Sequence, residues 1–398
     1  MKKYTVGLLG APINNGNMGC LALTYSLISL LEDIASKNNI IFNYINFEGV
    51  KNEQSILLLC EKLNLCRKKI ESHNIYPVES LLGLLHRPLV APKTIYAMKK
   101  CTFFIDLTQG DSFTDIYGNS VFNKNVNGKL LVKKLGKPLI LGPQTYGPYN
   151  KKRNEKKAKK AIEKADLVIS RDNKSKKCIS SFSNSHVYTT TDLAFALPFK
   201  KIENDSSTIK VGVNISGLLV SQKKEKTPIK YKLKADYDDY INKLIKWLIE
   251  KKYEIYIIPH VIDDDKIDIA LKYSNDINFI KMYNDPISVK NQIAQMDIFI
   301  GARMHATIGA LSSDVASIPC AYSRKFNGLY ESLNYPYVID LLNDSTDVCI
   351  EKTKQYVLDY KVLRNKGKQA MKEVIYKTNL TKDLLERYLK KIELDERY

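Results

Sequence analysis

The sequence predicts an α/β protein with two Rossmann-like domains that face each other across a cleft. Short apolar stretches typical of buried strands alternate with amphipathic helical patterns along most of the chain. The chain has 398 residues, which exceeds what one hydrophobic core usually supports. A polar, turn-rich segment at residues 201–210 separates two series of these patterns, and it is the expected linker.

The first domain is expected to span residues 1–200. It opens with a strand at Tyr4–Gly10, a small polar loop and an apolar-periodic helix at about residues 21–35. The loop contains glycines, but they do not keep the G-x-G-x-x-G spacing, so the loop indicates nucleotide binding only weakly. Further strands are expected at residues 40–47, 101–107, 138–142 and 166–170.

Polar residues follow the strands of this domain. Asp111 and Ser112 follow the strand at residues 101–107, and exposed polar groups in such a turn suit a hydroxyl-rich ligand. The alternative is an Asx-type turn that only caps the next helix. Arg171 stands at the end of the strand at residues 166–170, and Asp192 lies in a loop that precedes the linker.

The second domain is expected to span residues 201–375, and residues 376–398 to form a C-terminal helix that crosses back to the first domain. Ser216 follows a strand that ends near Asn214. His260 directly follows a strand at residues 254–259, with Asp263–Asp265 shortly after it. A His/Asp metal site is one interpretation. Because no second histidine lies nearby, we favour acids that stabilise the N-terminus of a helix.

The second domain is organised around the stretch Asp297–Leu329. A short strand ends at Gly301, and Arg303 and His305 follow it just before an Ala-rich helical run at residues 306–311. Open α/β sheets bind ligands at the carboxyl ends of their strands, and a helix N-terminus favours anions. A second strand at residues 317–321 delivers further polar side chains to the same edge, Tyr322, Arg324 and Lys325. The pattern predicts an anion-handling catalytic site.

Composition and charge limit the partners. The formal net charge is +19, which indicates anionic partners, although much of it lies in runs typical of solvent-exposed faces, residues 151–164 and 222–234. No recognition helix, RNP-like motif or zinc knuckle is present, so no nucleic acid is expected. The seven cysteines are scattered and odd in number, which favours free thiols and a cytoplasmic protein. No window offers the roughly 18 apolar residues of a membrane span, so any contact with the inner leaflet is peripheral.

Residues 301–329, GARMHATIGALSSDVASIPCAYSRKFNGL, resemble the C-terminal signature of the polysaccharide pyruvyl transferase family, in which an Arg-x-His-Ala element precedes a helix. Loops near residues 17, 110, 143, 171, 192, 260 and 303 occur in the family's order. Asn17 and Gly19 match its opening Asn-x-Gly loop, although Cys20 stands where many members have an acid. The resemblance implies a glycosyltransferase-B-like fold. It also implies transfer of a pyruvyl group from phosphoenolpyruvate to two sugar hydroxyls of a bacterial-type exopolysaccharide or its precursor, with release of phosphate.

The resemblance also implies roles for individual residues. The two anionic groups of phosphoenolpyruvate require fixed cations, and His305 is the candidate proton donor because imidazole titrates near neutral pH. The expected catalytic residues are His305, Arg303 and Arg171. The expected donor-binding residues are Arg171, Arg303, Lys325, His260, Tyr322 and Ser216, and the expected acceptor-binding residues are Asn17, Asp111, Ser112 and Asp192. Phosphoenolpyruvate is a co-substrate, and no cofactor or metal is expected.

The expected partners are phosphoenolpyruvate and a glycan or lipid-linked saccharide acceptor, and the sequence is compatible with a homo-oligomer. Two other classes remain open. A glycosyltransferase-B-type enzyme with a nucleotide-sugar donor would share the architecture, but it usually carries a Glu or a second basic residue for the ribose in its last domain. A non-catalytic anion-binding or nucleic-acid-binding protein would explain the charge.

Overall fold

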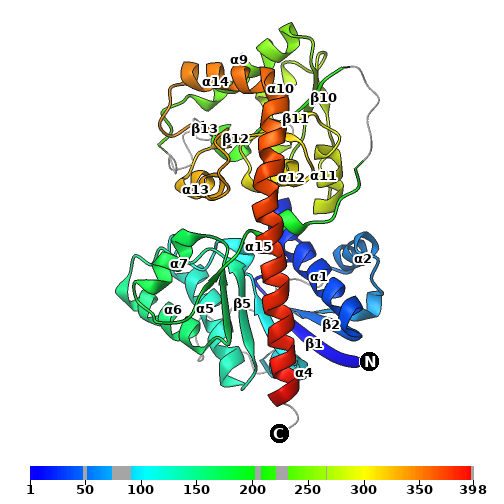
Figure 1. Ribbon diagram of the computed structural model, residues 1–398, viewed down its shortest axis with the longest axis vertical. Coiled ribbons are helices and arrows are strands. Elements are labelled where there is room, and N and C mark those ends of the chain that lie inside the picture. Colours follow the sequence, from blue (N-terminus) through cyan, green and yellow to red (C-terminus); the bar gives the residue numbers. More distant parts are fainter. Residues whose placement is uncertain (48–51, 74–90, 202–207, 221–231, 266, 396–398) are drawn as a thin grey trace. The chain divides into compact units, whose positions relative to one another are not determined.

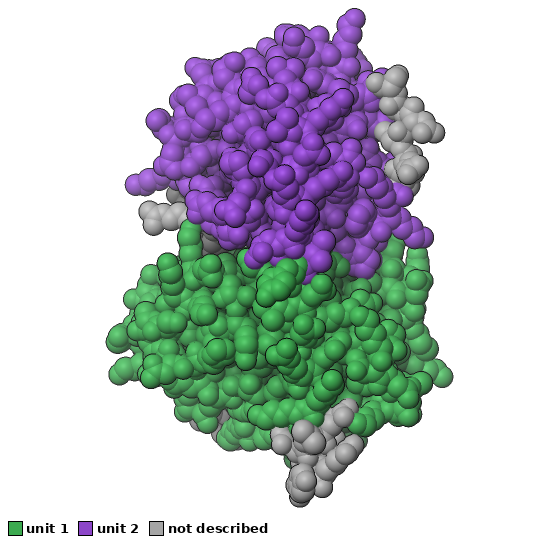
Figure 2. Space-filling model, in the orientation of Figure 1, with its two compact units in different colours: residues 1–15, 23–196, 376–398 green, residues 16–22, 197–375 purple. Residues whose placement is uncertain are grey.

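The structure, a computed structural model, describes residues 1–47, 52–73, 91–201, 208–220, 232–265 and 267–395. The chain divides into two compact units, which Figure 2 distinguishes by colour. Unit 1 comprises Met1–Asn15, Leu23–Ala196 and Tyr376–Tyr398. Unit 2 comprises Gly16–Ala22 and Leu197–Ile375. The short segment 16–22 therefore groups with the C-terminal half of the sequence, and the C-terminal segment groups with the N-terminal half.

The described part of unit 1 contains a sheet of seven strands, all paired in parallel, in the order β3-β2-β1-β4-β5-β6-β7. Its central strands are buried on both faces, as parallel strands covered by helices are. The strands are β1 (Lys2–Leu9), β2 (Ile40–Asn46), β3 (Ile70–Ser72), β4 (Phe103–Asp106), β5 (Leu139–Gln144), β6 (Leu167–Ser170) and β7 (Tyr188–Thr189).

Helices cover both faces of this sheet. The strand order reverses direction at β1, and right-handed crossovers place helices on opposite faces on either side of such a point. In Figure 1, α5, α6 and α7 accordingly lie on one side of the sheet and α1 and α2 on the other. One apolar core joins α4 to α7 with the sheet. The helices are α1 (Met18–Asn38), α2 (Glu53–Lys62), α4 (Ala91–Lys100), α5 (Asn119–Lys134), α6 (Lys152–Lys164) and α7 (Asn173–Ser180).

The described part of unit 2 contains a second parallel sheet, of six strands, in the order β10-β9-β8-β11-β12-β13. The central strands β8, β11 and β12 are almost entirely buried. The strands are β8 (Lys210–Asn214), β9 (Glu254–Ile257), β10 (Asn278–Phe279), β11 (Ile298–Gly301), β12 (Ala316–Ala321) and β13 (Ile339–Asp340).

The helices of unit 2 alternate with these strands. A large apolar core packs α9 and α14 onto the sheet. The helices are α8 (Gly217–Val220), α9 (Tyr237–Glu250), α10 (Asp268–Leu271), α11 (Pro286–Ile293), α12 (Met304–Ser312), α13 (Arg324–Ser332), α14 (Thr346–Leu358) and α15 (Tyr360–Asp395). The last of these, α15, passes from unit 2 into unit 1 at residue 376. Two parallel sheets with alternating helices confirm the predicted α/β class.

One described helix, α1, is apolar and long enough to cross a membrane, contrary to the expectation that no such window exists. Its most apolar window is 78% buried inside the protein. Side chains on several faces of α1 are buried, among them Leu23, Tyr25 and Ile28. Its composition therefore reflects a helix that is covered on most sides.

Candidate active site

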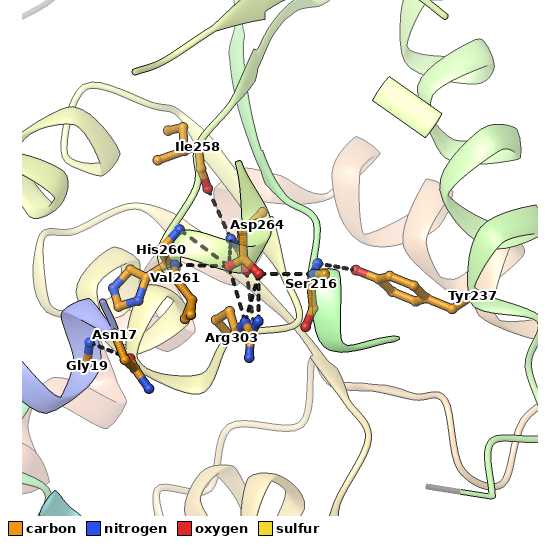
Figure 3. A network of polar contacts seen from close by, with 11 residues as sticks. Asn17, Gly19, Ser216, Tyr237, Ile258, His260, Val261, Asp264 and Arg303 are labelled. Atoms are coloured by element: carbon orange, nitrogen blue, oxygen red, sulfur yellow. Dashed lines mark hydrogen bonds and ion pairs between the residues drawn. The ribbon is translucent and has the colours of Figure 1, made fainter. Parts of the chain in front are cut away.

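The candidate site of unit 2 lies where three neighbouring strands end. Asn214 is the last residue of β8, His260 follows β9, and Arg303 follows β11. Because the carboxyl ends of parallel strands meet at one edge of a sheet, these residues lie together although they are far apart in sequence. Figure 3 shows this network of polar contacts.

Asp264 is the centre of the network. It is 1% exposed, in the short 3-10 helix Ile262–Asp264. Its Oδ1 accepts a hydrogen bond from the backbone N–H of Gly217 at 3.0 Å, and its Oδ2 accepts one from Asn214 Nδ2 at 3.3 Å. The backbone N–H groups of Val261 and His260 also donate to Oδ2, at 3.2 and 3.4 Å. The loops after β8 and β9 are thus tied to one carboxylate.

The same carboxylate holds Arg303. Arg303 Nη2 lies 2.6 Å from Asp264 Oδ1, and Nε lies 3.1 Å from each carboxylate oxygen. The backbone N–H of Arg303 donates to Asn214 Oδ1 at 3.1 Å. Burial acts to lower the pKa of Arg303, but the hydrogen bonds and charge of Asp264 outweigh it and raise the pKa. Among the described residues the guanidinium makes no further hydrogen bond, so its Nη1 donors can serve a ligand.

Asp264 has the expected role at a helix N-terminus and a second role that was not expected. Its carboxylate accepts from the backbone N–H of Val261, the N-cap of the short 3-10 helix, and it is also buried and pairs with Arg303. Asp263 and Asp265 are exposed. A largely buried arginine needs a carboxylate partner, and any of the three acids at residues 263–265 could provide it. Nothing in the sequence indicates which of the three is buried.

His305 lies in the first turn of α12, two residues after Arg303, and is half-buried. A Cβ atom added to Gly19 would lie 2.2 Å from His305 Nδ1, closer than any real contact of this kind. Only glycine therefore allows the N-terminus of α1 to approach the imidazole this closely.

Asn17 groups with unit 2, and not with the first domain to which its acceptor role was assigned. The backbone explains this placement, since Met18 N–H donates to the carbonyl of His260 at 3.1 Å and Ile262 N–H donates to that of Gly16 at 2.9 Å. The side chain of Asn17 accepts from Gly19 N–H at 2.9 Å, at the start of α1. Asn17 thus shapes the backbone turn beside His305.

His260 is neutral at physiological pH. It is 5% exposed, and burial, together with the nearby His305 and Arg303, lowers its pKa to about 3. Ser216 is fully buried, and its backbone N–H donates to Tyr237 Oη at 3.0 Å. Among the described residues, Ser216 Oγ has no hydrogen-bond partner. Tyr237 was not anticipated from the sequence, where it reads only as a core position of α9.

Two further expected donor residues follow β12. Tyr322 is half-buried, and its ring packs against Phe326 with the centroids 5.9 Å apart. Lys325 lies in α13, but its side chain lies outside the described part of the structure.

Unit 1 contains another arginine at a strand end, and this one is buried. Arg171 follows β6 and is 7% exposed, and its Nη1 lies 2.7 Å from Asp192 Oδ2. Burial acts to lower the pKa of Arg171, whereas the charges of Asp192, Asp111 and Asp172 raise it, and the net effect is a raised pKa. A Cβ added to Gly110 would lie 3.1 Å from Arg171 Nη1, so the loop after β4 closely approaches this guanidinium.

Asp192, expected to bind the acceptor, is fully buried. One carboxylate oxygen accepts from Arg171 and the other from Ala194 N–H at 2.9 Å. Both oxygens are therefore engaged inside the protein, and the residue positions Arg171 in this structure.

Asp111 and Ser112 are half-buried in the loop after β4. Tyr117 Oη donates to Asp111 Oδ2 at 2.9 Å, and Asn125 Nδ2 donates to the carbonyl of Ser112 at 2.9 Å. The next helix, α5, begins only at Asn119, with Gly118 as its N-cap. The alternative that Asp111 caps this helix is therefore wrong.

The sequence pattern of the polysaccharide pyruvyl transferase family matches residues 17–324. The match spans most of the chain and includes Arg171, Arg303 and His305. The chain belongs to this family. No curated protein sequence matches it.

Solved structures show what this pyruvyl transferase family member resembles in fold. The UDP-GlcNAc 2-epimerase of Neisseria meningitidis bound to UDP-GlcNAc superposes with a TM-score of 0.61 at 12% identity, over 98% of this chain and 100% of that one. A putative UDP-N-acetylglucosamine 2-epimerase of Listeria monocytogenes gives 0.62 at 11% identity, over 93% and 91%. MurG of Acinetobacter baumannii gives 0.51 at 10% identity, over 97% and 100%. The chain therefore has a glycosyltransferase-B-like fold.

The sequence of this family member did not reveal a buried ion pair at the ends of β4 and β5. Lys129 is fully buried, with Nζ 2.9 Å from Asp106 Oδ2 and 4.3 Å above the Phe113 ring. Gln144 Nε2 donates to the carbonyl of Asp106 at 3.0 Å, and Arg171 N–H donates to that of Gln144 at 3.2 Å. Lys129 was not among the expected site residues, although it shares the buried face of α5 with Phe122, Val126 and Val132.

Proposed function

We propose that this chain is a cytoplasmic, ketal-forming pyruvyl transferase. It moves the pyruvyl group of phosphoenolpyruvate onto two hydroxyls of a saccharide in a surface polysaccharide or its precursor. The single observation that supports this most strongly is the position of Arg303. Asp264 holds its guanidinium in place, and Arg303 lies two residues before His305 in the sequence. A cation and an imidazole at one helix N-terminus suit an anionic substrate that must be protonated.

Arg303 binds the donor in this proposal. Asp264 occupies the Nε and Nη2 edge, so a carboxylate or phosphate oxygen binds at Nη1. The N-terminus of α12 adds a partial positive charge at the same place. Arg171, fixed by Asp192, is the second guanidinium for the two anionic groups of phosphoenolpyruvate.

His305 protonates the donor. The choice between the two histidines rests on charge, because the lowered pKa of His260 keeps it neutral, and a neutral imidazole is a poor acid. His260 then serves as a neutral neighbour that adds no repulsion toward protonated His305.

The proposed reaction balances without an oxidant or reductant. His305 gives a proton to the methylene carbon of phosphoenolpyruvate, which becomes the methyl group, and a sugar hydroxyl oxygen bonds to the adjacent carbon. The bond between that carbon and the phosphate oxygen breaks, and the second hydroxyl oxygen takes its place. Of the two hydroxyl protons released, one restores His305 and the other leaves with phosphate.

The direct test is phosphate release from phosphoenolpyruvate with and without glycan acceptors. Acceptor-dependent release, with pyruvate ketal on the product by mass spectrometry, is expected. A parallel reaction with UDP-GlcNAc tests the nucleotide-sugar alternative, because the structurally similar epimerases are described with that ligand. Turnover of UDP-GlcNAc without any phosphoenolpyruvate reaction would refute the proposal.

Two variants assign the roles. His305→Ala should lower turnover about 1000-fold and leave phosphoenolpyruvate affinity within about threefold, because it removes the acid but no fixed cation. His186→Ala is the matched control, since His186 is exposed in unit 1. Arg303→Lys should chiefly weaken donor binding, because an ammonium lacks the planar donor fork. Full activity of His305→Ala would remove His305 from the mechanism.

A further inference from the structure

Three apolar side chains of unit 1 are exposed in one short loop and the helix start that follows it. Ile116 is 47% exposed, Tyr117 37% and Val121 40%. We call these three residues the 116–121 patch. Single exposed apolar residues are common, but three within six positions form a local apolar surface in a chain that is otherwise rich in charge.

The patch is fixed in place beside the start of α6. The carboxylate of Asp115 accepts from the backbone N–H groups of Asn150 and Lys151 at 2.8 and 3.0 Å, and from Asn154 Nδ2 at 3.0 Å. Burial acts to raise the pKa of Asp115, but these hydrogen bonds outweigh it and lower the pKa. The residue just before the patch is therefore tied to the first turn of α6.

Helix α6 presents a basic face next to the patch. Its buried face contains Ala158, Ala161 and Ile162. Arg153, Lys156 and Lys160 are exposed at helical spacing, and no acid pairs with any of them among the described residues. We call these three residues the α6 cations.

Lys157, on the side of α6 that faces α5, also indicates an excess of positive charge here. Lys157 lies between the two helices, where its Nζ donates to Asn123 Oδ1 of α5 at 2.7 Å. Burial lowers the pKa of Lys157, and the charge of Arg153 lowers it further. Positive charge is thus concentrated at this place beyond what nearby acids neutralise.

We propose that the 116–121 patch and the α6 cations together bind the surface of an anionic lipid bilayer. Apolar side chains with an aromatic ring partition into the interfacial region, and lysines and arginines beside them are attracted to anionic headgroups. A basic surface that served only solubility would carry lysines and arginines, but no exposed apolar residues would be needed beside them. A polyanion such as nucleic acid or an acidic glycan would use the cations but would gain nothing from Ile116 and Val121.

This surface lies close to an expected acceptor residue, which suits the proposed reaction. The proposal of membrane binding does not depend on that reaction. Tyr117 belongs to the patch and donates to Asp111, one of the expected acceptor residues. A bilayer bound at the patch would lie next to the loop after β4. Because vesicle binding is measured without phosphoenolpyruvate, its failure and a failure of the pyruvyl transfer assay are separate outcomes.

The test is co-flotation of the full chain with vesicles made of equal parts phosphatidylglycerol and phosphatidylcholine, compared with pure phosphatidylcholine. We expect binding to the anionic vesicles at about 0.05 M salt, weakened but still present at about 0.15 M, and none to the neutral vesicles. A triple variant, Arg153→Gln, Lys156→Gln, Lys160→Gln, should weaken binding about 100-fold. Ile116→Ser with Val121→Ser should weaken it about 10-fold at unchanged net charge.

A matched control separates this surface from overall charge. Lys361, Lys366 and Lys372 are exposed on α15, and their replacement by Gln removes the same charge elsewhere. The control should bind within about threefold of wild type. Equal losses in the two triple variants would overturn the proposal, because only net charge would then matter. No binding of the wild type to anionic vesicles, or an unchanged affinity of the Ile116→Ser, Val121→Ser variant, would overturn it as well.

Discussion

Arg303 presents its Nε and Nη2 edge to the carboxylate of Asp264, with Nη2 2.6 Å from Oδ1 and Nε 3.1 Å from Oδ2. The side chain of Arg303 is 13% exposed and that of Asp264 is fully buried. A pair of this kind contributes little net stability, yet the removal of one partner leaves an uncompensated buried charge. The pair therefore fixes the orientation of the guanidinium, and the site depends on Asp264 for that orientation.

Asp264→Asn should destabilise unit 2 and weaken donor binding. The amide keeps the shape of the carboxylate but loses the charge that balances Arg303, so we expect a loss of about 3 kcal/mol in the free energy of unfolding. Urea unfolding and calorimetric titration with phosphoenolpyruvate measure the two effects. Asp263→Asn is the control, because Asp263 is exposed and its replacement should stay within about 0.5 kcal/mol of wild type. Equal effects of the two substitutions would contradict the structure.

Gly19→Ala should impair catalysis with little effect on stability. The added methyl group would displace the imidazole of His305, and a displacement of about 1 Å can lower turnover about 100-fold. Alanine favours the helical backbone of α1, so unfolding should shift by less than about 1 kcal/mol. Gly128→Ala in α5 is the matched control, because a Cβ added there meets nothing within 4 Å. A fully active Gly19→Ala enzyme would show that the contact with His305 does not matter.

Asp192→Asn distinguishes a residue that positions Arg171 from one that binds the acceptor. If Asp192 acts through Arg171, the substitution should raise the KM for phosphoenolpyruvate about tenfold or more and leave the KM for the acceptor within about threefold. Steady-state kinetics with each substrate varied in turn give both constants. The opposite pattern, a higher KM for the acceptor alone, would restore the acceptor role that the sequence suggested.

Much of the fold could be predicted because its elements carry local signals. The strands at β1, β2, β8, β9 and β11 are apolar runs that end at Gly, Asn or Pro, and α9 shows a clear helical period. The ends of the elements were less predictable. The strand expected at residues 254–259 is only Glu254–Ile257 in the structure, because its pairing with β8 ends at Ile257.

The candidate site was predicted only where its residues are neighbours in sequence. Arg303 and His305 stand together before a helix, so one short segment reveals them. The partners of these residues come from other segments, as Asp264 and Gly19 do, and no local pattern joins them to Arg303 or His305. Lys129 was missed although helical spacing places it on the buried face of α5 with Phe122, Val126 and Val132. A lysine is rarely buried without a partner, and its partner, Asp106, comes from another segment.

The free energy of unfolding of unit 2 should rise with pH because Lys290 is buried. It is 2% exposed in α11, its Nζ donates to the carbonyl of Leu197 at 2.7 Å, and the Phe199 ring lies 4.8 Å away. Burial lowers its pKa to about 7 in the folded protein, whereas an unfolded lysine keeps its proton up to about pH 10.4. Between these values the unfolded chain binds more protons, so stability increases with pH and is lost again as the pH falls toward 7.

Lys290→Met should remove this dependence. The difference in unfolding free energy between wild type and variant should change by up to about 1.4 kcal/mol per pH unit from pH 7.5 to 9.5, in favour of wild type at higher pH. Urea unfolding at several pH values measures it. Lys361→Met changes the net charge equally but removes an exposed side chain, so its curve should run parallel to that of wild type. A Lys290→Met curve that also runs parallel would mean that Lys290 keeps its proton inside the folded protein, with its ammonium satisfied by the Leu197 carbonyl and the Phe199 ring.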